Sequence, residues 1–482
     1  MNNIPAKQKD DLLSKYYTDP KTRLLVIIIG SSLILVMAIV IIIITATTTN
    51  KIYENEQILE GYIPLNSLTV KYIIEDPSKP ILLYNESYIK HIHSFKVDGV
   101  KVENITNEYF FDKEGEHTIK LSFKKPLKST NDLFLNCEDL IEVNLTNLTT
   151  EKIRTASNMF NGCSNLTFVD FTDFDSTNLQ NISNMFYGCT SLTSLHLIFD
   201  GPALEDMSGA FAKCTNLTSI NLHYCNFRNV VNISGLFYEC ESLEDIILFF
   251  FNTYKAKDMS YMFYGCSNLT SVFQDIYTAN VVYMKGMFEG CKSLENITIE
   301  SFDTKNVEDM SFMFKDCLSL TSIDISNFDT KNVTDMTGMF SNCINLEFMN
   351  MSILDIHNVV NMSNMFNNCI SLREIYLDNL NPDYLVNMDG MFANCLSLEY
   401  LNMTNFTANY VEDIRYLLDG CGNITYIDFR SFNTTKIERY ENCFRGLPEY
   451  GIVIYDPFLF NNNILELFPN SWEKKDINTI MT

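Results

Sequence analysis

Apolar and polar residues follow one pattern that repeats about every 26 residues over most of this chain. The first part of each copy places apolar residues at i, i+3, i+4 and i+7, in one copy Met310, Met313, Phe314 and Cys317. That spacing is typical of one face of a short helix. The second part carries apolar residues that end in strand-like alternation, in the same copy Leu320, Ile323 and Ile325. Each copy is therefore expected to form a strand, a turn and a short helical segment.

The cysteines mark the same period. Twelve of the fourteen are separated by nine intervals of 26 and two of 25 residues: Cys137, Cys163, Cys189, Cys214, Cys240, Cys266, Cys291, Cys317, Cys343, Cys369, Cys395 and Cys421. A thirteenth, degenerate copy contains Cys443 in place of a Met. Tandem units of this length indicate a solenoid, because one unit alone cannot bury its apolar face whereas stacked neighbours share a core.

The predicted fold class is an α/β solenoid, a leucine-rich-repeat array of about thirteen 25–26-residue units over residues 131–455. A parallel β-sheet is expected on one face and short helical turns on the other. The repeat resembles the BspA-like leucine-rich-repeat family of microbial surface proteins, over about two-thirds of the chain. The motif that carries this resemblance runs from Met310-Ser311-Phe312-Met313-Phe314 through Cys317 and Leu320 to Phe328-Asp329-Thr330-Lys331-Asn332-Val333. The resemblance implies a cell-surface adhesion or host-binding role, with no catalytic residues.

A membrane anchor is predicted before the repeats. Leu24 to Ala46 is a run of 23 residues without a charge, and at about 1.5 Å per residue it is long enough to cross a hydrocarbon core of roughly 30 Å. A cleaved signal peptide is the alternative, but its apolar run is normally about 7–15 residues. The basic residues near this segment lie mostly on its N-terminal side: Lys7, Lys9, Lys15, Lys21 and Arg23. This distribution predicts a cytoplasmic tail at residues 1–23 and an extracellular location for the repeats.

The remaining segments complete a single-pass surface protein. Residues 47–60 are expected to form a stalk, and residues 61–130 a small β-rich module that caps the first repeat. Turn signals at Asp98-Gly99 and Glu114-Gly115 separate the strand-like runs of that module. Residues 456–482 are expected to cap the other end with a closing helix.

Charge and composition exclude several functions. Asp and Glu number 60 against 35 Lys and Arg, a net charge of −25 that disfavours nucleic-acid binding. The chain has no Gly-rich phosphate loop, and its six histidines lack the spacing of a zinc site. Because the cysteines are expected to point inward, a Cys–His nucleophile pair has no candidate. We therefore expect no enzyme activity, no cofactor and no metal.

The cysteines are expected to be buried, free thiols. Every cysteine stands where another unit places an apolar side chain, and in-register stacking points neighbouring Cβ vectors the same way rather than toward each other. A ladder of disulfides and metal binding remain alternatives. The core ladder that best represents this expectation is Cys163, Cys189, Cys266, Cys317, Cys343, Cys369 and Cys395.

The outward strand positions provide the candidate binding face. Aromatic residues with acidic neighbours gather toward the C-terminal units: Phe348, Glu374, Tyr376, Tyr400, Tyr426 and Asp428. Rigid aromatic side chains are frequent binding anchors, so we expect a patch that recognises an extracellular protein or glycan. Ordinary exposed strand residues are the alternative interpretation of the same positions.

Seventeen N-x-[S/T] sequons follow the predicted anchor, although repeat copying explains many of them. The candidate glycosylation sites are Asn85, Asn104, Asn181, Asn216, Asn268, Asn332 and Asn423. The sequence as a whole predicts a membrane-anchored surface protein for adhesion or recognition, and the alternative is a glycosylated structural coat protein without a dedicated ligand.

Overall fold

The computed structural model describes residues 66–222, 225–247, 251–273, 276–297, 299, 301–377, 380–407 and 409–480. These residues belong to one compact unit, Asn66–Thr482. The predicted tail, the membrane segment Leu24–Ala46 and the stalk lie outside the described residues. Within the described part, no helix has the length and apolar character needed to span a bilayer.

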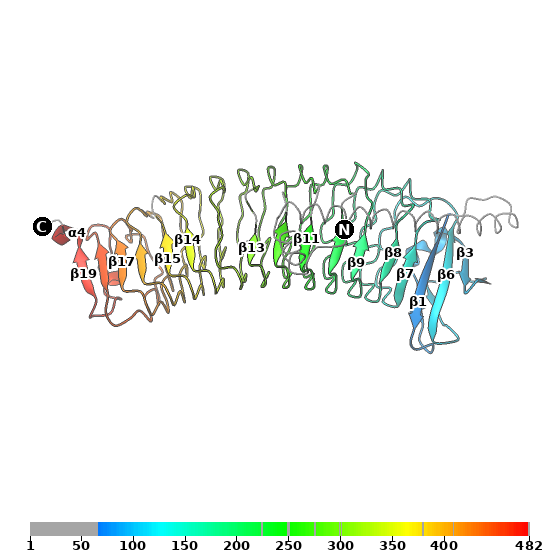
Figure 1. Ribbon diagram of the computed structural model, residues 1–482, viewed down its shortest axis with the longest axis horizontal. Coiled ribbons are helices and arrows are strands. Elements are labelled where there is room, and N and C mark those ends of the chain that lie inside the picture. Colours follow the sequence, from blue (N-terminus) through cyan, green and yellow to red (C-terminus); the bar gives the residue numbers. More distant parts are fainter. Residues whose placement is uncertain are drawn as a thin grey trace, which may run out of the picture. The chain divides into compact units, whose positions relative to one another are not determined.

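Residues 140–429 form successive coils, and most coils contribute one short strand to the same face (Figure 1). The paired strands of neighbouring coils run parallel and in register, as in Phe348↔Glu374 and Tyr400↔Tyr426. The coil between β13 and β14 forms no strand there, although residues 318–326 are all described. The strands of this face are β7 Leu140–Asn144, β8 Phe168–Asp170, β9 Ser194–His196, β10 Ser219–Asn221, β11 Asp245–Ile247, β12 Ser271–Phe273, β13 Asn296–Ile297, β14 Phe348–Asn350, β15 Glu374–Tyr376, β16 Tyr400–Asn402 and β17 Tyr426–Phe429.

A second ladder joins the coils at another point of their circumference. Twelve parallel β-bridges connect thirteen successive positions from Ser129 to Arg439, each 25 or 26 residues after the last. The predicted solenoid of about 26-residue repeats and its parallel strands on one face are therefore confirmed. With two parallel ladders per coil, the architecture is a β-solenoid.

The predicted helical turns are wrong. In the segment after each bridge, N–H groups bond alternately to the next coil and to a carbonyl three residues back: Phe312 N–H donates to the Thr337 carbonyl at 2.8 Å, and Met313 N–H to that of Met310 at 3.3 Å. An α-helix would pair each N–H with the carbonyl four residues back. Among the described residues the only α-helices are α3 Asn462–Leu465 and α4 Ile477–Ile480, near the C-terminus.

The backbone conformation of these turns explains why a helix cannot form. Every coil from residue 132 to 446 has two positions with φ between +52° and +79°, four residues apart, as in Phe312 and Asp316. Of these 26 positions, 11 are Gly, 8 are Asn and 2 are Asp, the residues that tolerate the left-handed region best. The apolar side chains still meet the core at i, i+3, i+4 and i+7, because successive tight turns bring them to the same side.

Side chains of equivalent positions stack along the interior of the solenoid. Ten successive phenylalanine pairs, from Phe134/Phe160 to Phe366/Phe392, have ring centroids 5.2–5.8 Å apart and near-parallel planes. Met310, Met313 and their equivalents are fully buried beside them. The continuous core therefore consists of columns of equivalent apolar residues, one from each coil.

All fourteen cysteines are buried with free thiols. From Cys163 to Cys421, each Sγ of the periodic series lies 3.0–3.3 Å from the carbonyl oxygen of a ladder phenylalanine, Phe134 for the first of them. Burial raises the pKa of these thiols, for Cys214 to about 12. Because only the thiolate is a good nucleophile or metal ligand, the columns are chemically inert at neutral pH.

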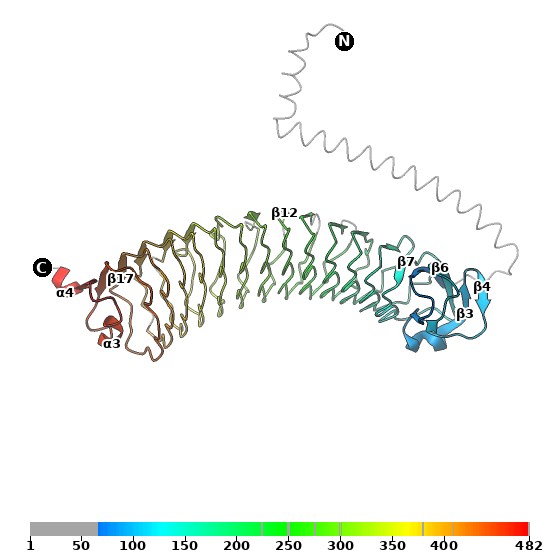
Figure 2. The same ribbon diagram turned by 90° about the horizontal axis from the view of Figure 1, so that it is seen from below.

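Both ends of the solenoid are covered (Figure 2). At the N-terminal end an antiparallel sheet in the order β4-β3-β6-β1 continues into β7 and β8, so that β1 extends the ladder beyond the first coil. At the other end β18 and β19 continue the ladder in parallel, and Phe468 stacks on Phe444 with centroids 4.0 Å apart. The additional elements are β1 Ser67–Ile74, β2 Ile81–Leu82, the 3₁₀-helix η1 Glu86–His91, β3 Ile92–Val97, β4 Val100–Val102, β5 Glu108–Tyr109, β6 Gly115–Phe123, β18 Ile452–Tyr455 and β19 Glu473–Asp476.

Candidate binding surfaces

The strand face of the C-terminal coils carries two pairs of aromatic rings, of which Tyr426 is half-buried and the other three are exposed. Phe348 on β14 and Tyr376 on β15 meet edge to face, with centroids 5.4 Å apart and planes at 69°. Tyr400 on β16 and Tyr426 on β17 are register partners and stack at 4.7 Å and 12°. Phe348, Tyr376 and Tyr400 are 40–47% exposed. The structure thus places these four predicted residues together on one face.

The two predicted acidic residues of this face differ from each other. Glu374 is exposed, and its carboxylate accepts a hydrogen bond from the Tyr376 hydroxyl at 3.4 Å. Asp428 is only 2% exposed, and Arg430 Nε donates to both of its carboxylate oxygens at 3.0 and 3.1 Å. Asp428 is therefore a buried ion-pair residue, and its predicted place on the binding face is wrong.

The predicted glycosylation sites lie in two kinds of environment. Asn104, Asn216, Asn268, Asn332 and Asn423 are exposed, whereas Asn85 and Asn181 are half-buried. Some of them already join coils through the amide nitrogen that a glycan would modify: Asn181 donates to Asp206, Asn216 to the Thr190 carbonyl and Asn332 to the Lys305 carbonyl. A glycan at these three positions would have to fit beside the neighbouring coil.

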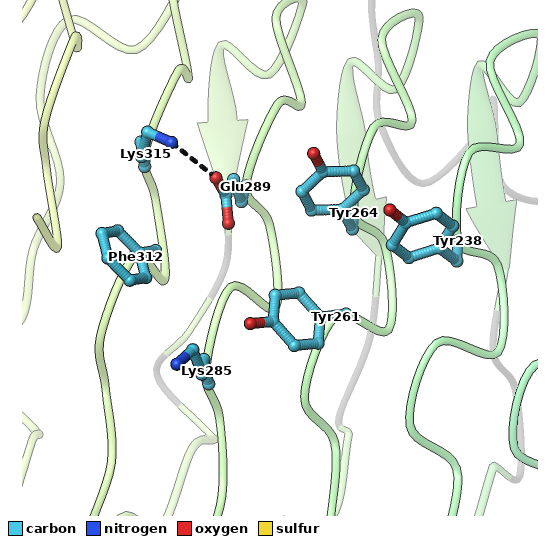
Figure 3. Close-up of a pocket in the computed structure, with 7 residues that line it drawn as sticks. All are labelled: Tyr238, Tyr261, Tyr264, Lys285, Glu289, Phe312 and Lys315. Carbon is cyan, nitrogen blue, oxygen red and sulfur yellow. Dashed lines mark hydrogen bonds and ion pairs between the residues drawn. The ribbon is translucent and has the colours of Figure 1, made fainter.

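The turn segments of the middle coils line an open surface pocket of about 450 Å³ (Figure 3). Its residues come from four successive coils, and one position of the repeat supplies Tyr238, Tyr264, Glu289 and Lys315. Tyr238 and Tyr264 stack with centroids 4.5 Å apart and planes at 7°. The remaining lining residues are Tyr261, Lys285 and Phe312. We call this set the tyrosine pocket.

Polar and aromatic groups alternate around the tyrosine pocket. Lys315 Nζ lies 2.8 Å from a Glu289 carboxylate oxygen, and that carboxylate side chain is only 11% exposed. The ammonium groups of Lys285 and Lys315 lie 5.6 and 5.4 Å from the Phe312 ring centroid, distances at which a cation is attracted to a ring face. The Tyr261 hydroxyl points toward Lys285 in Figure 3. The pocket thus combines flat apolar surfaces with donors and acceptors.

The tyrosine pocket was not expected from the sequence, because the predicted binding residues were those of the strand face. A signal was present in the turn segments. The position of Tyr261 and Phe312 is Gly, Asn or Asp in ten of the thirteen coils, so an aromatic residue there departs from the repeat. The departure could be recognised only once that position was known to need a left-handed backbone.

Stacked coils with two parallel ladders, a buried core and side-chain patches on the outside define the described part of the chain as a β-solenoid of tandem repeats. The chain belongs to the family described as "Mycoplasma protein of unknown function, DUF285", which matches residues 107–219, 205–298, 258–351 and 338–451.

Solved structures give weaker similarities. A leucine-rich cell surface protein from Faecalibacterium prausnitzii is 16% identical over 72% of this chain and 83% of its own, with a TM-score of 0.28. The structure of the Drosophila Toll–Spätzle complex contains a chain that is 15% identical over 67% of this chain and 51% of its own, with a TM-score of 0.24. Neither similarity is close enough to transfer a ligand or an activity. No curated protein matches this chain.

Proposed function

We propose that this chain is a membrane-anchored cell-surface protein whose BspA-like, leucine-rich-repeat-type solenoid recognises an extracellular protein or glycan through its strand face. The observation that carries the proposal is the two aromatic contacts on one face of consecutive coils, Phe348/Tyr376 and Tyr400/Tyr426, in which every ring but the half-buried Tyr426 is exposed. Aromatic rings held by a rigid scaffold lose little conformational entropy on binding, which favours them as anchors.

The anchor in this proposal is Leu24 to Ala46, with residues 1–23 in the cytoplasm and the solenoid outside. Protease treatment of intact cells that express the full chain tests this topology. We expect the repeats to be digested and a tag on the N-terminal tail to be protected. Protection of the repeats in intact cells would contradict the proposed location.

The recognition role is tested with cells that display the full chain and are applied to a panel of host-cell surfaces, extracellular-matrix proteins and glycans. Saturable binding that a soluble competitor abolishes is expected. Tyr376→Ser, Tyr400→Ser and Tyr426→Ser together should weaken it at least tenfold, because all the rings but Phe348 are removed. Tyr384→Ser is the matched control, since Tyr384 is 61% exposed but lies outside the strands.

The second candidate function is a glycosylated coat protein without a dedicated ligand. The exposed sequons at Asn104, Asn268 and Asn423 are the observation that favours it. The two functions predict different results in the same assay. Absence of saturable binding to every surface, combined with a gel-mobility shift on enzymatic deglycosylation, would favour the coat protein.

A further inference from the structure

We infer that the tyrosine pocket is a binding site for a neutral saccharide, separate from the strand face. Its residues come from turn segments of the coils at 238–315, whereas the strand-face patch lies on β14 to β17. The inference therefore stands independently of the function proposed above, and either can fail without the other.

Two of the aromatic residues that line the pocket are held there with a strained backbone. Tyr261 and Phe312 both have φ of 59°, a conformation that is an outlier for a bulky side chain. Ten of the thirteen equivalent positions avoid this strain by using Gly, Asn or Asp. Backbone strain of this kind persists where surrounding structure enforces it and concentrates at functional sites.

The neighbouring coils make room for both rings. A Cβ atom on Gly286 would lie 2.6 Å from the Tyr261 ring, and one on Gly338 would lie 2.7 Å from the Phe312 ring. Each strained aromatic residue is thus followed, one coil later, by a glycine on which its ring can lie. In both cases the strained aromatic residue and the glycine of the following coil together place a flat ring beside the pocket.

The chemistry of the lining also suits a saccharide. A pyranose ring has an apolar C–H face, which packs on aromatic rings such as the Tyr238/Tyr264 stack, and hydroxyl groups that both donate and accept hydrogen bonds. The Glu289 carboxylate and the Lys315 ammonium, 2.8 Å apart, offer an acceptor and a donor side by side, which matches two adjacent hydroxyls. The volume of about 450 Å³ lies within the range of small-molecule sites.

Charge excludes other ligand classes. The three tyrosines and the Glu289 carboxylate alone would suit a cationic ligand. The ammonium groups of Lys285 and Lys315 would repel such a ligand. An anionic ligand is disfavoured because Lys315 is engaged by Glu289 and lies 3.8 Å from Asp316, in a chain of net charge −25. An uncharged ligand with hydroxyl groups is the remaining class, because it can pack on the flat rings and hydrogen-bond to the Glu289–Lys315 pair.

The test is saturation-transfer NMR on the full chain, in a detergent without sugar headgroups, with methyl glycosides of glucose, galactose, mannose, N-acetylglucosamine and fucose as probes. We expect transfer to the ring protons of at least one of them. Tyr238→Ala with Tyr264→Ala should raise its dissociation constant at least tenfold. Tyr187→Ala is the matched control, because Tyr187 holds the same repeat position two coils before Tyr238, outside the pocket.

A second variant separates binding from folding. Tyr261→Asn relieves the strained backbone, so we expect loss of saccharide binding together with a thermal midpoint equal to or above that of the parent. Tyr416 has φ of 55° at the same repeat position but does not line the pocket, so Tyr416→Asn should keep binding unchanged.

Several results would overturn the inference. These are the absence of transfer from every methyl glycoside at millimolar concentration, binding restricted to acidic sugars or to a protein, and binding that survives both Tyr238→Ala/Tyr264→Ala and Tyr261→Asn. A lower thermal midpoint for Tyr261→Asn would assign that ring to the fold rather than to a ligand.

Discussion

The phenylalanine column provides the sharpest test of how the coils hold together. Phe314 is fully buried and stacks on Phe288 at 5.6 Å and on Phe340 at 5.5 Å. Phe314→Ala removes both ring contacts, each worth about 0.5–1.5 kcal/mol, and leaves a cavity in a close-packed interior. Core substitutions of this kind cost about 3–5 kcal/mol. Because each coil contacts only its neighbours, the loss is confined to two interfaces between coils.

Urea denaturation with amide hydrogen exchange measures this effect. We expect Phe314→Ala to lower the free energy of unfolding by about 3–5 kcal/mol and to speed exchange mainly between residues 288 and 340. Phe348→Ala is the matched control: Phe348 is the same residue type but is 40% exposed and makes one ring contact, with Tyr376, so its loss should cost only about 0.5–1.5 kcal/mol. Similar values for the two variants would refute the stacked-core reasoning.

Three further predictions concern charges and turns. Burial alone would raise the pKa of Asp413, but hydrogen bonds and charge from Arg415, 2.8 Å away, lower it. The ionised Asp413 therefore contributes its full stabilisation above the ordinary pKa of 3.8, and this stabilisation is lost as pH falls through the lowered pKa. Asp413→Asn should lower the free energy of unfolding by about 1–3 kcal/mol, measured by denaturant unfolding at pH 7. His357 Nδ1 donates a hydrogen bond to the Asp355 carboxylate at 2.6 Å, and this bond together with the Asp355 charge raises the pKa of His357 above 6.5. The pair therefore stabilises fully below pH 6.5 and loses this stabilisation as pH rises through the raised value. An NMR titration should show Asp355→Asn returning the pKa of His357 toward 6.5, and an unchanged titration would contradict the pairing. Gly290 has φ of +78°, and a Cβ there would lie 3.3 Å from the Gly265 backbone in the preceding coil, so Gly290→Ala should lower the free energy of unfolding by about 1–2 kcal/mol; a stabilised variant would argue against the left-handed turn.

Much of the solenoid was predictable from the sequence, because the same side chains recur at the same inward positions. The period, the parallel strands and the buried Met310, Met313 and Phe314 follow from repetition and apolar spacing. The helical interpretation failed since the i, i+3, i+4, i+7 spacing also arises from successive tight turns. Asn158 and Gly162, both left-handed and four residues apart, are the kind of residues that distinguish the two structures.

The candidate surfaces were only partly predictable. The Tyr400/Tyr426 stack follows from their spacing of 26, because register partners on parallel strands lie side by side. The burial of Asp428 did not follow, since it depends on how Arg430 folds back over the strand. The tyrosine pocket could not be predicted without the geometry of the turns. The alternating hydrogen bonds of the turn segments determine which side chains of neighbouring coils face each other there.

The central claim is that the coils enclose a dry interior lined by free thiols, methionines and phenyl rings. Counting thiols by mass spectrometry tests it most directly. The full chain is treated with iodoacetamide without reductant, first native and then unfolded in guanidinium. We predict no alkylated cysteine in the native protein and all fourteen alkylated after unfolding, because every thiol is buried and free. Labelling of several thiols in the native protein, or fewer than fourteen after unfolding until a reductant is added, would contradict the account.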